Sequence, residues 1–140
     1  MELPTQRVLT LELSKAIAEV ARSYATERGW TIVLAIVDAG GHLVYFERMD
    51  GVAYGTVQVA ILKAQSSAAF KTPSKTFENA VDDGLFGLAG LPGMAPYEGA
   101  VPITVDGVTL GAIAVSGVTK EIDGEIAQAA ADAAAELLRD

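Results

Sequence analysis

The chain has 140 residues, of which 51% are apolar and 20% charged. This composition is typical of a folded globular protein, excludes a disordered chain, and predicts one domain over residues 1–140. The net charge of −8 argues against a nucleic-acid or anionic-membrane partner, because both need a cationic surface. The absence of cysteine excludes disulfides, thiolate nucleophiles and cysteine metal sites.

The N-terminal residues carry acids early and contain no uninterrupted apolar stretch, so we expect no signal peptide. The longest unbroken apolar run, residues 32–37, is too short to cross a bilayer. We therefore expect a cytoplasmic protein.

Apolar residues first recur at helical spacing, over about residues 10 to 28, and predict an amphipathic helix that ends at Gly29. The segment "WTIVLAIVD" is rich in β-branched residues and predicts a buried strand. It is followed by "AGGH", a tight turn, and by "LVYFER", a second strand. This part of the chain therefore predicts a hairpin.

A helix is expected next, from about Thr56 to Lys71, because Pro73 ends the helical pattern. The segment "TPSKTFENAVDDG" predicts a short third helix with Thr72 or Ser74 as its N-cap. Residues 84–99, "GLFGLAGLPGMAPYEG", combine five glycines and two prolines with large apolar side chains. We expect no long regular element there, and predict that Leu85–Tyr97 forms a mobile apolar wall of a ligand pocket or a contact between subunits.

A second hairpin is predicted by "AVPITV", a "DG" turn and "VTLGAIAVSG". The last helix carries Glu121, Asp123 and Glu125 near its start, where the helix dipole favours acids. The complete order is α-β-β-α-α-β-β-α. It predicts an α+β fold in which helices pack against an antiparallel sheet.

Lys63 is the single charge in the 19 residues that follow Gly51. It lies away from the narrow polar strip of its helix, which Gln58 and Gln65 form, so we place its ammonium near an interior or an interface. A buried ammonium needs a carboxylate or a ligand anion, and Asp50 is a plausible partner. Two interpretations remain open: a lysine that serves a pocket, or one that reaches solvent or makes a structural ion pair.

Arg48 and Asp50 flank the end of the second strand. Arg48 either clamps a ligand carboxylate with its guanidinium or closes the strand with an ion pair. Asp50 either orients that arginine and acts as a base or caps the turn into the next helix. His42 is the sole histidine and is expected to be exposed in its turn, so we predict no metal site.

The segments "VDAGGHLVYFERMDG", "AILKAQSSAAF", "PITVDGVTLGAIAVSG" and "EIDGEIAQAA" resemble the GlcG/HbpS family of haem-binding-like proteins and the C-terminal domain of PduO-type proteins. The resemblance implies a profilin-like or Roadblock-like sandwich that forms a homo-oligomer. It also implies a small organic ligand, with haem or a corrinoid as possible cofactors. Gly99-Ala100 and Gly117-Val118 stand where the family often has Gly-Gly.

Two functions follow. The chain is a homo-oligomeric small-molecule-binding protein, or it is a cofactor-independent isomerase or tautomerase of a small carboxylate. In the second case Arg48 is the carboxylate clamp and Lys63 or Asp50 moves the proton. The candidate ligand-binding residues are Arg48, Lys63, Phe86, Met94, Tyr97 and Ser116.

Overall fold

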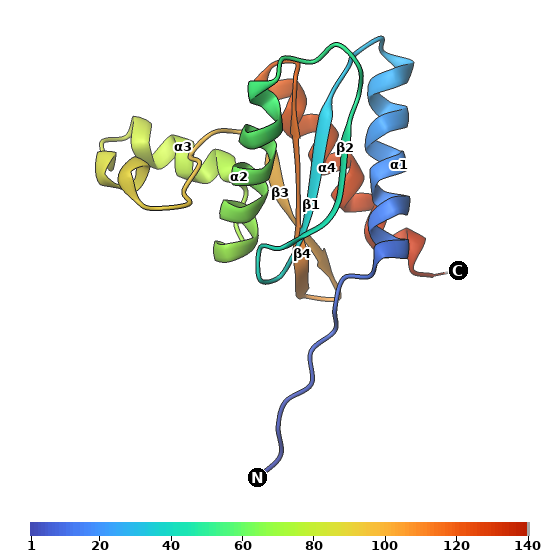
Figure 1. The fold of residues 1–140 in the computed structure, drawn as a ribbon. Helices are drawn as coiled ribbons and strands as arrows, with labels where there is room; N and C mark the ends of the chain where they lie inside the picture. Colours follow the sequence, from blue (N-terminus) through green and yellow to red (C-terminus); the bar gives the residue numbers. More distant parts are fainter. Residues whose placement is uncertain (140) are drawn as a thin grey trace.

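The computed structural model describes residues 1–139 (Figure 1). Its elements are α1 (Leu11–Glu27), β1 (Val33–Asp38), β2 (Leu43–Arg48), α2 (Gly55–Phe70), α3 (Ser74–Asp82), the 3-10 helix η1 (Phe86–Gly90), β3 (Ala100–Val105), β4 (Val108–Ser116) and α4 (Lys120–Leu137). The predicted α+β order is confirmed, and η1 is added within the segment that we expected to have no long regular element. No helix in this part of the chain has the length and apolar character needed to cross a membrane.

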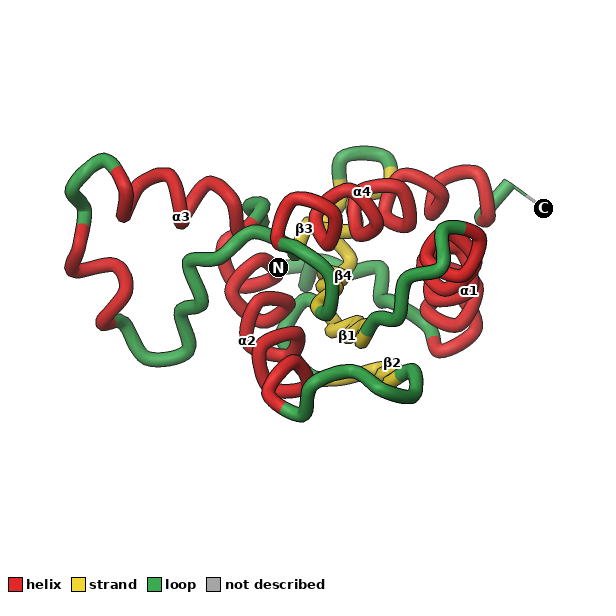
Figure 2. The backbone as a smooth tube through the Cα atoms, turned by 90° about the horizontal axis from the view of Figure 1, so that it is seen from above, coloured by secondary structure: helices red, strands yellow, loops and turns green. Residues whose placement is uncertain are grey.

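The four strands form one antiparallel sheet in the order β2-β1-β4-β3. Each predicted hairpin forms, and the two hairpins join side by side through β1 and β4. Seen from above, α1 and α4 cover one face of the sheet and α2 lies on the other (Figure 2). The sheet is therefore the middle layer of three.

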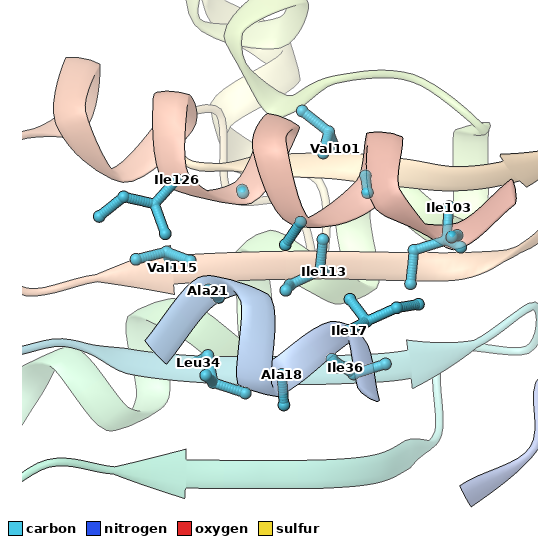
Figure 3. Packing of buried hydrophobic residues seen from close by; sticks show 14 of the residues in the cluster. Ile17, Ala18, Ala21, Leu34, Ile36, Val101, Ile103, Ile113, Val115 and Ile126 are labelled. Carbon is cyan, nitrogen blue, oxygen red and sulfur yellow. The ribbon is translucent and has the colours of Figure 1, made fainter. Parts of the chain in front are cut away.

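The face toward α1 and α4 holds the main core. Alternate strand residues point to this face, as strand geometry requires, and they are large and branched. Ile36, Ile113 and Val115 meet Ile17 of α1 and Ile126 of α4 (Figure 3). Ordinary aliphatic packing thus fixes both flanking helices.

The face toward α2 is built from much smaller side chains. Ala35, Ala112 and Ala114 of the sheet meet Ala60 and Ala64 of the helix. Because alanine has only a methyl group, α2 approaches the strands closely. This approach carries the polar residues of α2 into the interior, where Lys63, Ser66 and Ser67 are buried.

The "DG" turn of the second hairpin has both residues in the left-handed region, with φ of 51° at Asp106 and 77° at Gly107. This is the backbone of the two-residue turn whose twist suits a hairpin.

The prediction of a Thr72 or Ser74 cap on α3 is wrong. Pro73 occupies the N-cap position, and no side chain caps the helix there. Ser74 is instead buried, and its Oγ accepts a hydrogen bond of 3.0 Å from the backbone N–H of Ala100. The hydroxyl therefore ties α3 to the start of β3, a long-range contact that local sequence does not encode.

The segment formed by α3 and η1 projects away from the sheet (Figure 1). Leu85, Phe86 and Leu91 on this segment are exposed. Leu85 and Phe86 line neither of the two clefts described below, whereas residues 91–94 line one of them and Tyr97 lines the other.

Candidate functional site

A cleft of about 410 Å³ lies where the first turns of α2 and α4 meet the end of β4. In Figure 1 these helix starts lie at the same end of the sheet. We call it the Lys63 cleft. Its lining consists of one lysine from each helix, an aspartate, a tyrosine, small residues and the chain between β4 and α4, namely Ala53, Gly55, Thr56, Val59, Lys63, Tyr97, Ser116, Gly117, Val118, Thr119, Lys120 and Asp123.

Lys63 lies at the inner side of this cleft and is 0% exposed. Its Nζ donates hydrogen bonds to two backbone carbonyls, that of Val115 at 2.7 Å and that of Glu98 at 3.1 Å. Burial lowers the pKa of Lys63 from 10.5 to about 8, although Asp123, Glu78 and Glu98 act in the opposite direction. No carboxylate in residues 1–139 lies within 4.0 Å of the ammonium, so its charge has no direct ion pair.

Gly99 provides the space for this lysine. Its φ of +136° belongs to a region that side chains disfavour. A Cβ built there would collide with Lys63 Nζ and lie 2.8 Å from the Val115 carbonyl oxygen. A glycine at this position is therefore needed for the lysine to reach its two carbonyls.

Asp123 contributes a buried carboxyl group from the first turn of α4 and is 4% exposed. Burial raises the pKa of Asp123, while the backbone N–H groups of Val118 and Gly117 and the charge of Lys63 act in the opposite direction. The hydrogen bond from the N–H of Val118 to Oδ1 is 3.1 Å long. Asp123 therefore holds the loop between β4 and α4 in the shape that lines the cleft.

Lys120 lies at the mouth of the cleft and pairs with Glu78 of α3 at 2.8 Å. Burial of Glu78 favours the neutral acid, but the bonds from Lys120 and from the Glu98 N–H hold its pKa below the usual value. The ring of Tyr97 lies 5.6 Å from Lys120 Nζ and 5.8 Å from Lys63 Nζ. A half-exposed aromatic ring thus lies close to two ammonium groups.

Ser116, the last residue of β4, is 3% exposed and lines the cleft. Its Oγ has no hydrogen-bond partner in the described chain, and neither does Ser67 Oγ on α2. Buried hydroxyls are usually paired, so an orphaned hydroxyl on a cleft wall points to a ligand or to water. Ser67 does not line the cleft and serves below as a matched control.

Residues 9–132 match the sequence model of a family described as haem degrading protein HbpS-like. The chain belongs to the HbpS-like family. Among its relatives, Protein GlcG of Escherichia coli K12 is 32% identical over 114 residues, which cover 81% of this chain and 85% of GlcG.

Two solved structures extend this comparison. Klebsiella pneumoniae protein ORFY superposes with a TM-score of 0.89 at 29% identity, covering 96% of each chain. The PduOC–haem complex superposes with a TM-score of 0.84 at 28% identity, covering 91% of this chain and 95% of that one. The HbpS-like fold predicted from sequence is therefore confirmed.

Three of the predicted ligand-binding residues lie in the cleft of this HbpS-like chain. Lys63, Tyr97 and Ser116 come from α2, from the loop before β3 and from β4. Met94 lines a different cleft of about 470 Å³, together with Phe70 and the turn at Gly40.

Phe86 is 73% exposed on η1 and lines neither of these clefts. Arg48 and Asp50 are exposed at the end of β2 and are not among the residues that line the Lys63 cleft. The suggested pairing of Asp50 with Lys63 is wrong, because Lys63 donates to two carbonyls and its nearby acids are Asp123, Glu78 and Glu98. His42 is exposed beside Asp38, as expected.

Sequence reasoning missed Asp123 as a site residue. The acid was interpreted as a favourable charge at a helix start and as part of the segment "EIDGEIAQAA" that resembles the family. A signal was present, because Asp123 shares the helical spacing of the buried Ile126, Ala127 and Ala130 and so falls on the buried side of α4. No group of three or more metal-ligating side chains gathers anywhere in residues 1–139.

Proposed function

We propose that this chain binds a small organic molecule in the Lys63 cleft and assembles with copies of itself. The observation that carries the proposal is a buried ammonium that faces a cleft without a direct ion pair. A buried charge left uncompensated is costly, so natural proteins keep one mainly where something binds it. Membership of the HbpS-like family and the fold shared with a haem complex support the same conclusion.

Haem is the first ligand to test, and the residues of the cleft fit it. The phenol of Tyr97 is a type of ligand that holds haem iron in some proteins. The ammonium groups of Lys63 and Lys120 suit the two propionates. Bound haem would supply redox and oxygen chemistry, and these residues would hold it in place.

A hemin titration followed by visible absorption tests the ligand. We expect a shifted haem band with the wild-type protein, a changed spectrum with Tyr97→Phe, and no change with His42→Ala, because His42 lies outside the cleft. No shift with the wild type would overturn haem as the ligand. If the shift disappears with His42→Ala, His42 and not Tyr97 is the axial ligand.

Self-association is supported by apolar side chains that one chain leaves exposed. Val59 and Phe70 of α2 and Leu85, Phe86 and Leu91 near η1 are the examples. Exposed apolar patches of this kind commonly mark contacts with a second protein. Sedimentation at micromolar concentration should give a mass above that of one chain, and a monomer would contradict the proposal.

A cofactor-independent isomerase is the second candidate, and the state of Lys63 favours it. A pKa of about 8 leaves a useful fraction of neutral amine near neutral pH. Such an amine can take a proton from the carbon beside a carbonyl and return it at another position. In this case Lys120, which lines the cleft, takes the carboxylate-holding role predicted for Arg48, because neither Arg48 nor Asp50 lines the cleft.

Proton exchange tests the isomerase directly. Pyruvate, a small oxo acid, is incubated with the protein in heavy water, and loss of its methyl proton signal is followed by NMR. We expect exchange that Lys63→Met abolishes and Arg48→Gln preserves. Exchange no faster than in buffer, over a series of oxo acids, would contradict catalysis of this type.

A further inference from the structure

Two hydrogen-bond donors of the Lys63 cleft have no acceptor. An ammonium carries three N–H bonds, and the carbonyls of Val115 and Glu98 accept from two of them. The hydroxyl of Ser116 is buried and unpaired within the described chain. Both groups line the same cleft, one from α2 and one from the end of β4.

The acceptor that would satisfy both donors is a negatively charged oxygen. The nearby acids Asp123, Glu78 and Glu98 attract Lys63 only from beyond ion-pair distance. Asp123 already accepts from the backbone N–H of Val118, and Glu78 already pairs with Lys120. Glu98 lies 4.0 Å from Lys75 Nζ. All three carboxylates therefore contact other groups of the protein, and the third N–H of Lys63 has no acceptor among the described residues.

We infer that a carboxylate oxygen of the ligand is bound between Lys63 Nζ and Ser116 Oγ, both of which donate to it. The inference rests on the proposed function, since it assigns the ligand's charged end to one place in the same cleft. The half-exposed ring of Tyr97 and the side chain of Val59 offer apolar surface beside this place. The ligand class is thus a carboxylate with a flat or apolar body.

Every titratable group that faces the bound carboxylate is accounted for. Lys63 and Lys120 favour it, while Asp123, Glu78 and Glu98 oppose it. The ring of Tyr97 lies beside both lysines. Asp123 is the one acid among the residues that line the cleft. Its raised pKa makes the carboxyl group less readily charged than an exposed aspartate, which weakens this opposition.

The test uses benzoate as a probe and benzyl alcohol as its uncharged counterpart. Lysine side chains are labelled with ¹³C at Cε, and the Lys63 signal is assigned by its absence in Lys63→Met. Benzoate should shift this signal and raise the Lys63 pKa, because an anion stabilises the ammonium, whereas benzyl alcohol should do neither. The assignment requires Lys63→Met to be folded, and the unchanged signals of the other lysines check this.

The hydroxyl is tested with a matched pair of variants. Ser116→Ala should weaken benzoate binding about ten- to a hundredfold, the usual worth of one hydrogen bond to a charged acceptor. Ser67→Ala removes the other orphaned hydroxyl and should leave the affinity unchanged. Neither change should lower the melting temperature, because each removes a polar group that has no partner.

The outcomes separate this inference from the function on which it rests. Equal binding of benzoate by wild type and by a folded Ser116→Ala variant, or no shift of Lys63 by benzoate, would overturn the carboxylate site. Hemin binding under the same conditions would leave the proposed function standing. If neither benzoate nor hemin binds, both proposals fail.

Discussion

The two faces of the sheet differ in what they bury. The face covered by α1 and α4 buries branched aliphatic side chains such as Ile36 and Ile113. The face covered by α2 buries mainly alanines, together with two valines, a lysine and several serines. The sheet is common to both, so the difference lies in the helices and in the side chains chosen for each face.

This contrast separates stability from recognition. Large apolar side chains gain the most free energy from burial, so the α1 and α4 face contributes most of the hydrophobic stabilisation. The alanine face gains less per residue, but it lets a helix carry Lys63 to within 2.7 Å of the Val115 carbonyl oxygen. We therefore expect substitutions on the first face to affect folding most, and substitutions of the polar residues on the second face to affect binding.

The largest effect is expected for Ile113→Ala on the aliphatic face. Ile113 is fully buried between both flanking helices, and the change leaves a cavity (Figure 3). The free energy of unfolding, measured by urea denaturation, should fall by about 2–5 kcal/mol. Val108→Ala, at an exposed position of the same strand, should change it by less than about 0.5 kcal/mol. A small effect at Ile113 would contradict the contrast between the faces.

On the alanine face, Lys63→Met should change how stability depends on pH. The unfolded chain holds the lysine proton up to pH 10.5, whereas the folded chain releases it near pH 8. The unfolded state therefore binds more protons between these values, so the wild type gains stability as pH rises through this window. The gain relative to Lys63→Met should reach about 3 kcal/mol, from a shift of about two to three pKa units.

Urea denaturation of both proteins from pH 7 to pH 10.5 measures this gain. The variant removes only the titration of Lys63, so the other ionisable groups cancel in the difference. If the difference in the free energy of unfolding between the two proteins stays constant with pH, Lys63 has the same pKa in the folded and unfolded chains. That result would contradict the effect expected from its burial.

The element order was predictable because each element has its own local pattern. Helical spacing marked α1 to within a residue at each end, and the "DG" turn marked the second hairpin. Lys63 was also predictable as an unusual buried charge, since one lysine in an apolar helix contradicts the pattern around it. Each of these features depends only on residues that are close in sequence.

The composition of the site was less predictable, because it depends on residues far apart in the chain. Lys63 meets carbonyls 35 and 52 residues away in sequence. Asp50 is the nearer acid in sequence, yet Asp123 is the acid beside the lysine. The requirement for glycine at position 99 was equally hidden, because a Cβ there collides with the Lys63 side chain, which comes from a distant helix. Local patterns predict elements, and their packing determines the partners.

A smaller effect is expected when an alanine of the α2 face is enlarged. Ala64→Leu adds volume where the helix and the strands are in close contact, and overpacking of this kind costs about 1–3 kcal/mol. Ala69→Leu, at an exposed position of the same helix, is the matched control and should be nearly neutral. If Ala64→Leu and Ala69→Leu unfold at the same temperature, α2 can move away from the sheet at no cost in free energy.

The smallest effect on folding is expected at Phe86, which belongs to neither face. Its ring is exposed on η1, so Phe86→Ser removes little buried surface and should change the free energy of unfolding by less than about 0.5 kcal/mol. If a second copy covers this ring, the same change should reduce self-association in sedimentation experiments, because an apolar contact is replaced by a hydroxyl. Val8→Ser alters another exposed apolar residue near the N-terminus and controls for the loss of surface hydrophobicity alone. An unchanged sedimentation profile for Phe86→Ser would exclude η1 from the contact between copies, and the exposed residues of α2 would then be the next to test.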